Sequence, residues 1–373
     1  CIGSEGAVLP LQVPEVEERI VFDGYDSIYG YGLWTTDGTA EGTHSVFSSD
    51  SLNIRPLDPE SFLEFNGMVY FVAYTDATGQ ELWKSDGTVS GTQIVTQIIE
   101  GEGGTVWSLN LLPSGIAFNA RSDEYGYEPH FFDGTSVRML ANVHENGGSY
   151  PFSFTQLGEK VCYIAEHNDY GEEIFCSDLD NPSENHTLLK DINPGEGSSY
   201  ANTLVATNQR LFFFAEALNQ NNNYRLWTSD GTEDGTYELY SDLDGYLELT
   251  NYSQTMLAMG DKVYFHALDS QTGNPSIFVS EGTLPTTLRL ADVETLPSSW
   301  TLRWLAIEDV LFFEGDDNNH GFEPWHTDGT ASGTSMLHDF NPASNSAVPP
   351  ATATLLGDKI FFAADANGYG AEP

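Results

Sequence analysis

Side chains that carry oxygen ligands gather in the loop 316–319, which reads Asp-Asp-Asn-Asn. Carboxylate and amide oxygens at such short spacing suit Ca²⁺, so Asp316, Asp317 and Asn319 are the candidate metal ligands. A second group of the same kind, His-Asn-Asp, occupies residues 167–169. Neither group has the spacing of a helix-loop-helix calcium loop. The sequence requires no cofactor, and Ca²⁺ is the ion that it suggests.

Residue sets typical of catalysis are missing from the sequence. It has no Gly-x-Ser-x-Gly elbow, no His-Glu-x-x-His pair and no phosphate-binding glycine loop before a helix. The nine histidines are scattered, and a metal shared by the two nearest, His320 and His326, is disfavoured. Because separation in space is invisible in a sequence, acid–base chemistry by two of the many carboxylates stays open. No catalytic residue is predicted.

A repeat positions these residues. Its clearest copy, residues 81–92, reads Glu-Leu-Trp-Lys-Ser-Asp-Gly-Thr-Val-Ser-Gly-Thr. The acidic residue that precedes Gly or Leu in each copy falls at positions 37, 86, 133, 178, 230, 281 and 328, so the period is about 48 residues. A fixed period of this size indicates a repeat architecture before any function is considered.

The aspartate of the Asp-Gly-Thr turn has two interpretations. The favoured one is structural: the carboxylate accepts backbone N–H groups while glycine takes a positive φ. The alternative is Ca²⁺ chelation together with the following threonine. These repeat aspartates are Asp37, Asp86, Asp133, Asp230 and Asp328.

Four strand-like segments are expected in each repeat. The second is rich in aromatic and β-branched residues, as in 68–73 and 211–215, and the third is the Glu-Leu-Trp segment. First segments such as 106–112 precede them, and fourth segments such as 93–98 follow the second Gly-Thr. No stretch has helical periodicity. The pattern predicts an all-β fold, a β-propeller of four-stranded antiparallel blades.

The chain should form one propeller domain over residues 18–373. Seven turns are present, and residues 350–373 begin a further, incomplete repeat. We therefore expect eight blades, with seven blades and a terminal extension as the alternative.

The seven tryptophans divide into two groups. Four recur at the repeat position, where core packing is favoured because phenylalanine or histidine replaces them in other copies: Trp34, Trp83, Trp227 and Trp325. The other three lie on or beside first strands, which line the channel of a propeller: Trp107, Trp300 and Trp304. These three are the better ligand-binding candidates, although core packing is favoured for them also. Trp300 and Trp304 would share a face of one strand.

Acidic residues dominate the charge. There are 56 Asp and Glu against 13 Lys and Arg, a net charge of −43. Such a surface repels phosphate backbones, so nucleic acid is excluded as a partner, and it is typical of a protein in a salty extracellular medium. No apolar run reaches the ~20 residues of a membrane helix, and hydrophobic residues at 40% are ample for a core.

The cysteines bear on compartment. Cys162 and Cys176 flank the loop 167–171 symmetrically, which places them opposite each other on antiparallel strands. A cross-strand disulfide is predicted and would suit an exported protein; two buried thiols on one sheet face are the alternative. Cys1, followed by small polar residues, looks like the lipidated first residue of a mature bacterial lipoprotein. Residues 1–17 would then be a tether, and an arbitrary start of the chain is the alternative.

The pattern Glu-Leu-Trp-x-x-Asp-Gly-Thr-x-x-Gly-Thr, with the later run Lys190-Asp191-Ile192-Asn193-Pro194-Gly195, resembles the ELWxxDGT repeat proteins, bacterial surface proteins sometimes called hyalin-like. The similarity extends from Glu18 onward. The resemblance implies a repeat architecture and export, and it implies no particular reaction.

We therefore expect a lipid-anchored β-propeller at the bacterial outer membrane or cell surface, acting as a binding or scaffolding module. Its partner would be an envelope protein complex or a polysaccharide, and it would meet the membrane only through its lipid. One alternative is a carbohydrate-active enzyme, a lyase or glycoside hydrolase, with its site at the channel mouth. Another is a structural surface protein bridged by Ca²⁺.

Overall fold

The computed structural model describes residues 15–16, 19–26, 30–46, 55–56, 62–98, 105–145, 147–180, 186–216, 224–239, 256–268, 275–291, 293, 304–340, 342, 354–356, 359–361, 364–365 and 371–372. The chain divides into two compact units. The first comprises Cys1–Asp169 and Phe175–Thr187, and the second comprises Tyr170–Ile174 and Leu188–Pro373.

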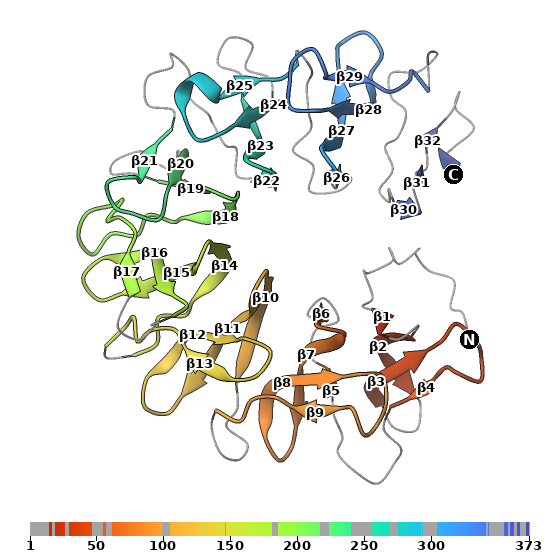
Figure 1. Cartoon of the computed structure of the whole chain (residues 1–373), viewed down its shortest axis with the longest axis vertical. Coiled ribbons are helices and arrows are strands. Elements are labelled where there is room, and N and C mark those ends of the chain that lie inside the picture. The colour runs from red at the N-terminus through yellow and green to blue at the C-terminus, as the bar shows by residue number, and fades with distance from the viewer. Residues whose placement is uncertain are drawn as a thin grey trace. The chain divides into compact units, whose positions relative to one another are not determined.

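Three sheets, two of four strands and one of five, follow one another in the first unit (Figure 1). They are β1(Glu15–Val16)–β2(Arg19–Asp26)–β3(Gly30–Thr36)–β4(His44–Ser45), then β5(Arg55–Pro56)–β7(Met68–Thr75)–β8(Gly79–Ser85)–β9(Gln93–Ile94) with β6(Leu63–Phe65) also paired to β7, then β10(Val106–Leu112)–β11(Gly115–Ser122)–β12(Gly126–Phe132)–β13(Val137–Met139). The fourth sheet contains residues of both units: β14(Phe152–Leu157)–β15(Lys160–His167)–β16(Gly171–Asp178)–β17(His186–Leu188).

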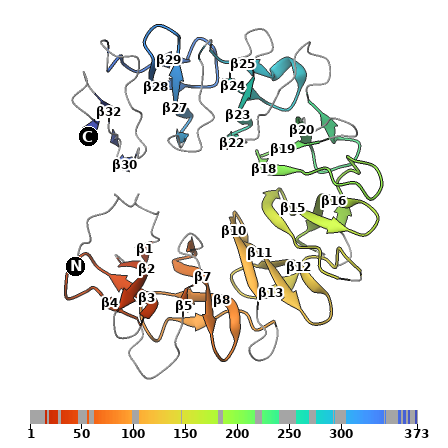
Figure 2. The ribbon, with the colours of Figure 1, turned by 180° about the vertical axis from the view of Figure 1, so that it is seen from behind.

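The second unit is likewise built of antiparallel sheets whose strands follow the order of the chain (Figure 2). Its sheets are β18(Asn202–Ala206)–β19(Leu211–Ala215)–β20(Arg225–Ser229)–β21(Tyr237–Glu238), β22(Met256–Met259)–β23(Lys262–Leu268)–β24(Pro275–Ser280)–β25(Leu288–Arg289) and β26(Leu305–Ile307)–β27(Val310–Asp316)–β28(Phe322–Thr327)–β29(Ser335–Met336). Two strand pairs come last: β30(Thr354–Leu356)–β31(Lys359–Phe361) and β32(Ala364–Asp365)–β33(Ala371–Glu372).

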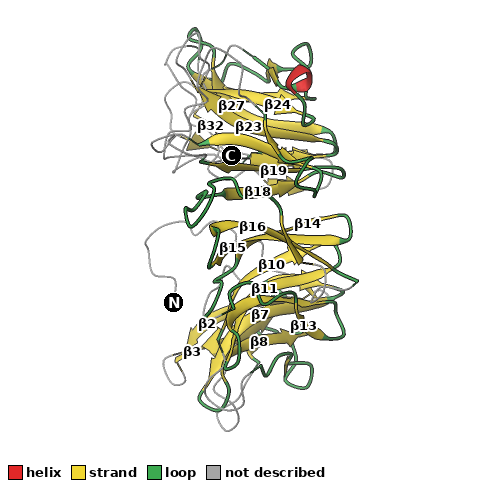
Figure 3. Cartoon of the chain, turned by 90° about the vertical axis from the view of Figure 1, so that its left-hand side faces the viewer, coloured by secondary structure: helices red, strands yellow, loops and turns green. Residues whose placement is uncertain are grey.

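Strands and loops make up almost all of the described chain (Figure 3). A 3₁₀ turn, η2(Leu284–Thr286), lies in the second unit. Seven sheets thus correspond to the seven copies of the repeat, six with four strands and one with the additional strand β6. The predicted all-β class with four antiparallel strands per repeat is confirmed. Within the described residues, no helix has the length and hydropathy needed to cross a membrane.

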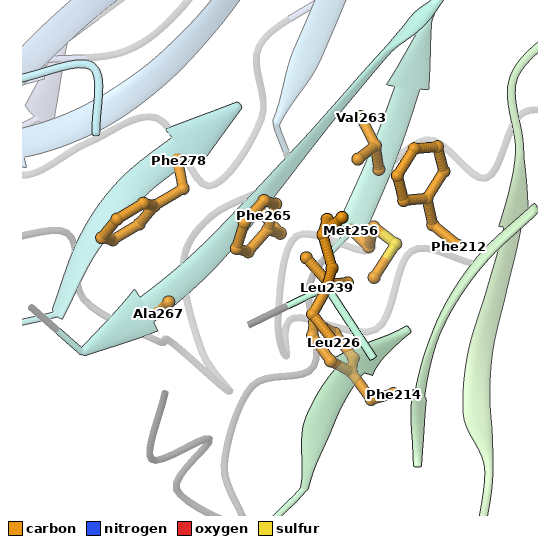
Figure 4. Packing of buried hydrophobic residues seen from close by; sticks show 9 residues of the cluster. All are labelled: Phe212, Phe214, Leu226, Leu239, Met256, Val263, Phe265, Ala267 and Phe278. Atoms are coloured by element: carbon orange, nitrogen blue, oxygen red, sulfur yellow. The ribbon is translucent and has the colours of Figure 1, made fainter. Parts of the chain in front are cut away.

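Each inner sheet is apolar on both faces, because successive strand residues point to opposite sides. On β7, Val69 and Phe71 pack with Val21 of the first sheet, whereas Tyr70 pairs with Phe132 of the third. The second unit repeats this arrangement. Phe265 packs in a cluster with residues of the preceding sheet (Figure 4), and the neighbouring Tyr264 packs with those of the following sheet. Such sheets need a neighbour on each side to remove their apolar faces from water.

The polar groups of the Asp-Gly-Thr turns form hydrogen bonds within the turns themselves. In the copy at 228–237, Asp230 Oδ1 accepts the backbone N–H of Thr232 at 3.0 Å and its hydroxyl at 2.6 Å. The Thr232 hydroxyl then accepts the N–H of Gly235 at 3.0 Å. A Cβ on Gly235 would lie 1.9 Å from the Asp230 carboxylate, and Gly231 has φ of +88°. Contacts within the turn therefore explain why Asp, Gly, Thr and the second Gly occur at these positions of the repeat.

Replacing the turn aspartate should weaken a repeat measurably. We expect Asp230→Ala to lower the free energy of unfolding by about 1 kcal/mol, since two hydrogen bonds to an exposed carboxylate are lost. Urea unfolding followed by tryptophan fluorescence measures this loss. The exposed neighbour Asp234 serves as control, and an equal loss in Asp234→Ala would contradict the turn role.

The fourth strands are shorter than the sequence predicts. Residues 93–98 were expected to form one strand, yet β9 ends at Ile94. Beyond it, Val95 and Thr96 both donate backbone N–H groups to the Leu82 carbonyl. Thr96 also donates its hydroxyl to the buried Glu81 carboxylate. The hydrogen bond to Glu81 of β8 therefore holds Thr96 away from the position it would have in a regular β-ladder.

Candidate functional site

The proposed calcium ligands are engaged in their own loop, between β27 and β28. Asp316 Oδ1 accepts the N–H of Asn318 at 2.7 Å, and Asp317 Oδ1 accepts those of Asn319 at 2.9 Å and His320 at 3.0 Å. Asp317 Oδ2 lies 2.8 Å from His320 Nδ1, and this hydrogen bond raises the pKa of His320. Among the described residues, no group of three or more His, Cys, Asp or Glu side chains is arranged to hold a metal.

The repeat tryptophans lie in or beside the core. Trp83 and Trp227 are buried, and Trp34 and Trp325 are half-buried. The Trp325 indole donates to the Gly315 carbonyl at 2.9 Å. Their rings face inward from the third strands, so they contribute packing area.

Two of the remaining tryptophan predictions have different outcomes. Trp300 lies outside the described residues. Trp304 is half-buried against the cluster that contains Leu311, with its ring edge-on to His266 at 4.7 Å. Burial lowers the pKa of His266 to about 4, so this imidazole is neutral at pH 7. Trp304 therefore fills space between sheets of the second unit.

Trp107 is exposed. It lies on β10 with 47% of its surface open, and its ring centroid is 5.7 Å from that of Tyr127 on β12. Tyr127 in turn stacks on Tyr150 at 5.1 Å, and Tyr150 is 53% exposed just ahead of β14. We call Trp107, Tyr127 and Tyr150 the Trp107 patch. Strands β10, β12 and β14, which carry or flank it, lie close together in Figure 1.

Backbone contacts hold Tyr150 against Tyr127. The N–H groups of Ser149 and Tyr150 both donate to the Tyr127 carbonyl, at 2.8 and 3.2 Å. A Cβ on Gly148 would come within 2.5 Å of the Tyr127 nitrogen, so only glycine permits this approach. Tyr150 itself has φ of +48°, an unusual conformation for a bulky residue.

A bulge aims Trp107 outward. The β10–β11 register shifts between Trp107 and Asn110, and Ser108 within the shift has φ of +54°. The same shift with a positive φ recurs in β14 at Ser153 and in β18 at Thr203. The bulge therefore belongs to the repeat, whereas the indole beside it is particular to this copy.

Polar groups border the patch. Asn119, the register partner of Trp107, is only 6% exposed, and its Oδ1 is covered and lacks a hydrogen-bond partner among the described residues. Arg121, the register partner of Tyr127, is half-exposed and pairs with Asp123 at 3.4 Å. Because Asn119 Oδ1 is covered, a ligand approaching the patch meets aromatic surface first.

The sequence prediction missed the glutamate that opens the repeat. The Glu128 carboxylate accepts the N–H groups of Val143 and His144 at 3.0 and 3.3 Å and the Ser149 hydroxyl at 2.6 Å. It thereby fixes the segment that leads to Tyr150. Glu173 accepts the N–H of Asn193 at 3.0 Å in the same manner. A charged residue recurring just before a buried strand core was the available signal.

These glutamates are buried, and burial changes their acidity. Burial raises the pKa of Glu128 to about 7 and that of Glu173 to about 8. Their role is internal, since both have no exposed surface.

No protein-family model matches the sequence, and no curated protein matches it. Similar solved structures include a puromycin-hydrolyzing peptidase of Mycobacterium tuberculosis, with 13% identity, a TM-score of 0.48 and coverage of 95% of this chain and 57% of that one. Another is puromycin hydrolase, with 12% identity, a TM-score of 0.44 and coverage of 96% and 58%. A third is the β-propeller domain of the Trilobed protease from Pyrococcus furiosus, with 11% identity, a TM-score of 0.41 and coverage of 87% and 92%. The chain spans less than two thirds of the first two, and similarities this weak carry no argument about function.

Proposed function

We propose that this chain is an exported β-propeller that binds or scaffolds a ligand at the bacterial cell surface, and that the Trp107 patch contacts the ligand. The patch is the single observation that carries the proposal. Aromatic side chains normally bury their area, yet here two of three rings are about half open and the backbone is fixed to present them.

The propeller architecture is the arrangement that best suits sheets with two apolar faces. A stack with free ends leaves two faces in water, whereas a closed ring leaves none. We propose eight blades, because β30 to β33 follow the seventh sheet as the start of another repeat; seven remains the alternative. Rigid blades would hold loops and edge residues in fixed positions, which suits recognition.

The remaining features of the proposal concern location and ligand. Lipidation of Cys1, which lies outside the described residues, would anchor the chain through residues 1–17. The ligand would be an envelope protein complex or a polysaccharide, and the ELWxxDGT resemblance supports a surface location.

Removing either exposed ring should weaken attachment strongly. We expect residues 1–373, prepared without a lipid on Cys1, to sediment with envelopes of the bacterium that produces the chain. Trp107→Ala or Tyr150→Ala should weaken this binding at least about tenfold, because aromatic anchors that become buried on binding dominate contact energies. Tyr200→Ala is the matched control: Tyr200 has the same positive φ, is 56% exposed and precedes β18 as Tyr150 precedes β14. Equal loss in all three variants, or no sedimentation of the wild type, contradicts the proposal.

A further inference from the structure

We propose that the Trp107 patch binds a neutral glycan, with sugar rings stacked on Trp107 and Tyr150. This inference rests on the proposed function and names the chemical class of its ligand.

The patch combines flat apolar faces with unused polar groups. No hydrogen bond within the described chain engages the Trp107 indole N–H or the Tyr127 and Tyr150 hydroxyls. A pyranose has the matching surface, since its C–H groups form apolar faces and its hydroxyls lie around the rim. Aromatic rings with hydrogen-bonding groups at their edges suit such amphipathic ligands.

Charge selects a neutral glycan over a polyanion. The chain carries a net charge of −43, so a polyanionic glycan would be repelled by the body that holds the patch. Stacking platforms for single-stranded nucleic acid lie in positively charged grooves. Here Arg121, the register partner of Tyr127, is already paired with Asp123.

The patch also differs from a cation site. Arg121 follows Ala120 on its second strand, and Glu166 and Glu216 follow the corresponding Ala165 and Ala215. In the second unit, burial and then the charges of Glu216 and Glu172 raise the pKa of Tyr224. A cationic ligand would favour tyrosine beside carboxylates, whereas the Trp107 patch has arginine at the equivalent place.

The surroundings disfavour a protein partner. Protein interfaces centre on anchors within a continuous apolar core. The neighbours of this patch are Ser108 and the segment 147–149, Gly-Gly-Ser. Leu111, exposed on the same strand, is paired with Ile116, whose side chain faces the opposite side from Asn119. Of the large hydrophobic residues that are exposed in the described chain, Trp107 and Tyr150 are the ones that belong to this patch.

The two open rings suit a chain of sugars. Tyr127 lies between Trp107 and Tyr150 and contacts both, so the outer rings form two separate platforms. A linear oligosaccharide long enough to reach both should bind at least about tenfold more tightly than a monosaccharide, because the second contact is then intramolecular.

The test uses residues 1–373 without a lipid on Cys1, and envelopes divided into three portions: untreated, oxidised with periodate to cleave vicinal diols, or digested with proteinase K. Binding is measured by sedimentation in low and high NaCl for the wild type and for Trp107→Ala, Trp107→Phe and Tyr200→Ala. We expect periodate to abolish binding and proteinase to spare it, with Trp107→Ala at least tenfold weaker. Trp107→Phe should retain part of the affinity because it keeps a platform.

The outcomes separate the two proposals. Binding that survives periodate but not proteinase overturns the glycan inference and leaves the binding function standing, with a protein as ligand. Binding that disappears in high NaCl overturns the neutral class in favour of a charged ligand. Failure to bind untreated envelopes overturns the proposed function itself.

Discussion

The free energy of unfolding should fall as the pH rises from 6.5 to 8.5, by an amount on the order of 3 kcal/mol. Burial raises the pKa of Glu128 to about 7 and the pKa values of Glu173 and Glu314 to about 8, against 4.5 for an ordinary glutamate. A group whose folded pKa is raised stabilises the fold below its unfolded pKa and loses this contribution as the pH rises through the folded value. The three carboxyls must ionise without solvent at pH 8.5, so native stability decreases.

The histidines do not oppose the glutamates between pH 6.5 and 8.5. Burial lowers the pKa of His130 and His266 to about 4. Their contribution is lost as the pH falls from 6.5 toward 4, so it opposes the glutamates only below 6.5. The hydrogen bond with Asp317 raises the pKa of His320, which acts in the same direction as the glutamates. Between pH 6.5 and 8 the glutamate effect should therefore be visible without opposition from buried histidines.

A single amide substitution tests the origin of the slope. Glu173→Gln keeps the size and an oxygen acceptor for the Asn193 N–H but cannot ionise, so we expect a shallower decline of stability with pH. Urea titrations followed by tryptophan fluorescence at pH 6.5, 7.5 and 8.5 measure it. The exposed Glu233→Gln should keep the wild-type slope. Identical slopes in wild type and Glu173→Gln would show that the buried carboxyl does not titrate in this range.

Local interactions explain why much of the fold could be predicted from the sequence. The turn at 228–237 depends on contacts within ten residues, so its spacing alone identifies it. Second strands are also predicted accurately: the predicted strand 211–215 is β19 itself, because its five consecutive apolar residues bury both faces. First strands such as β10 agree for the same reason, since they pair with an adjacent second strand.

The Trp107 patch could be predicted only in part. Trp107 was identified because it is absent from the repeat pattern, but Tyr127 and Tyr150 were not. Tyr150 belongs to the next repeat, and its contact with Tyr127 depends on a backbone approach that only Gly148 allows. Register shifts such as the one after Trp107 reverse which face a side chain occupies. A sequence shows neither the shift nor the neighbour that it brings close.

The buried glutamates show a second limit. A charged residue normally indicates a solvent-exposed position, so Glu81, Glu128 and Glu173 were assigned no role. In the structure each is fully buried, and the segment that leaves its repeat supplies hydrogen bonds to it. Such a role depends on groups about 15–20 residues away, which no local pattern specifies.

Loss of the disulfide should lower stability by about 3 kcal/mol. The predicted bond between Cys162 on β15 and Cys176 on β16 is present, which excludes the alternative of two free thiols in this structure. It joins residues 14 positions apart. Closing a loop of that size lowers the conformational entropy of the unfolded chain, which stabilises the folded state by about 3 kcal/mol.

Two independent routes remove the disulfide: chemical reduction and substitution of both cysteines. Both cysteines are buried, so substitution also changes the packing around them. The variant Cys162→Ala/Cys176→Ala also leaves a small cavity and should be at least as unstable as the reduced wild type. Urea unfolding of the oxidised wild type, the wild type reduced with tris(2-carboxyethyl)phosphine, and the variant gives the three stabilities. Hydrogen exchange should locate the added opening in β15 and β16. If reduction leaves stability unchanged while the variant is destabilised, packing of the two side chains, and not the covalent link, is what holds this hairpin.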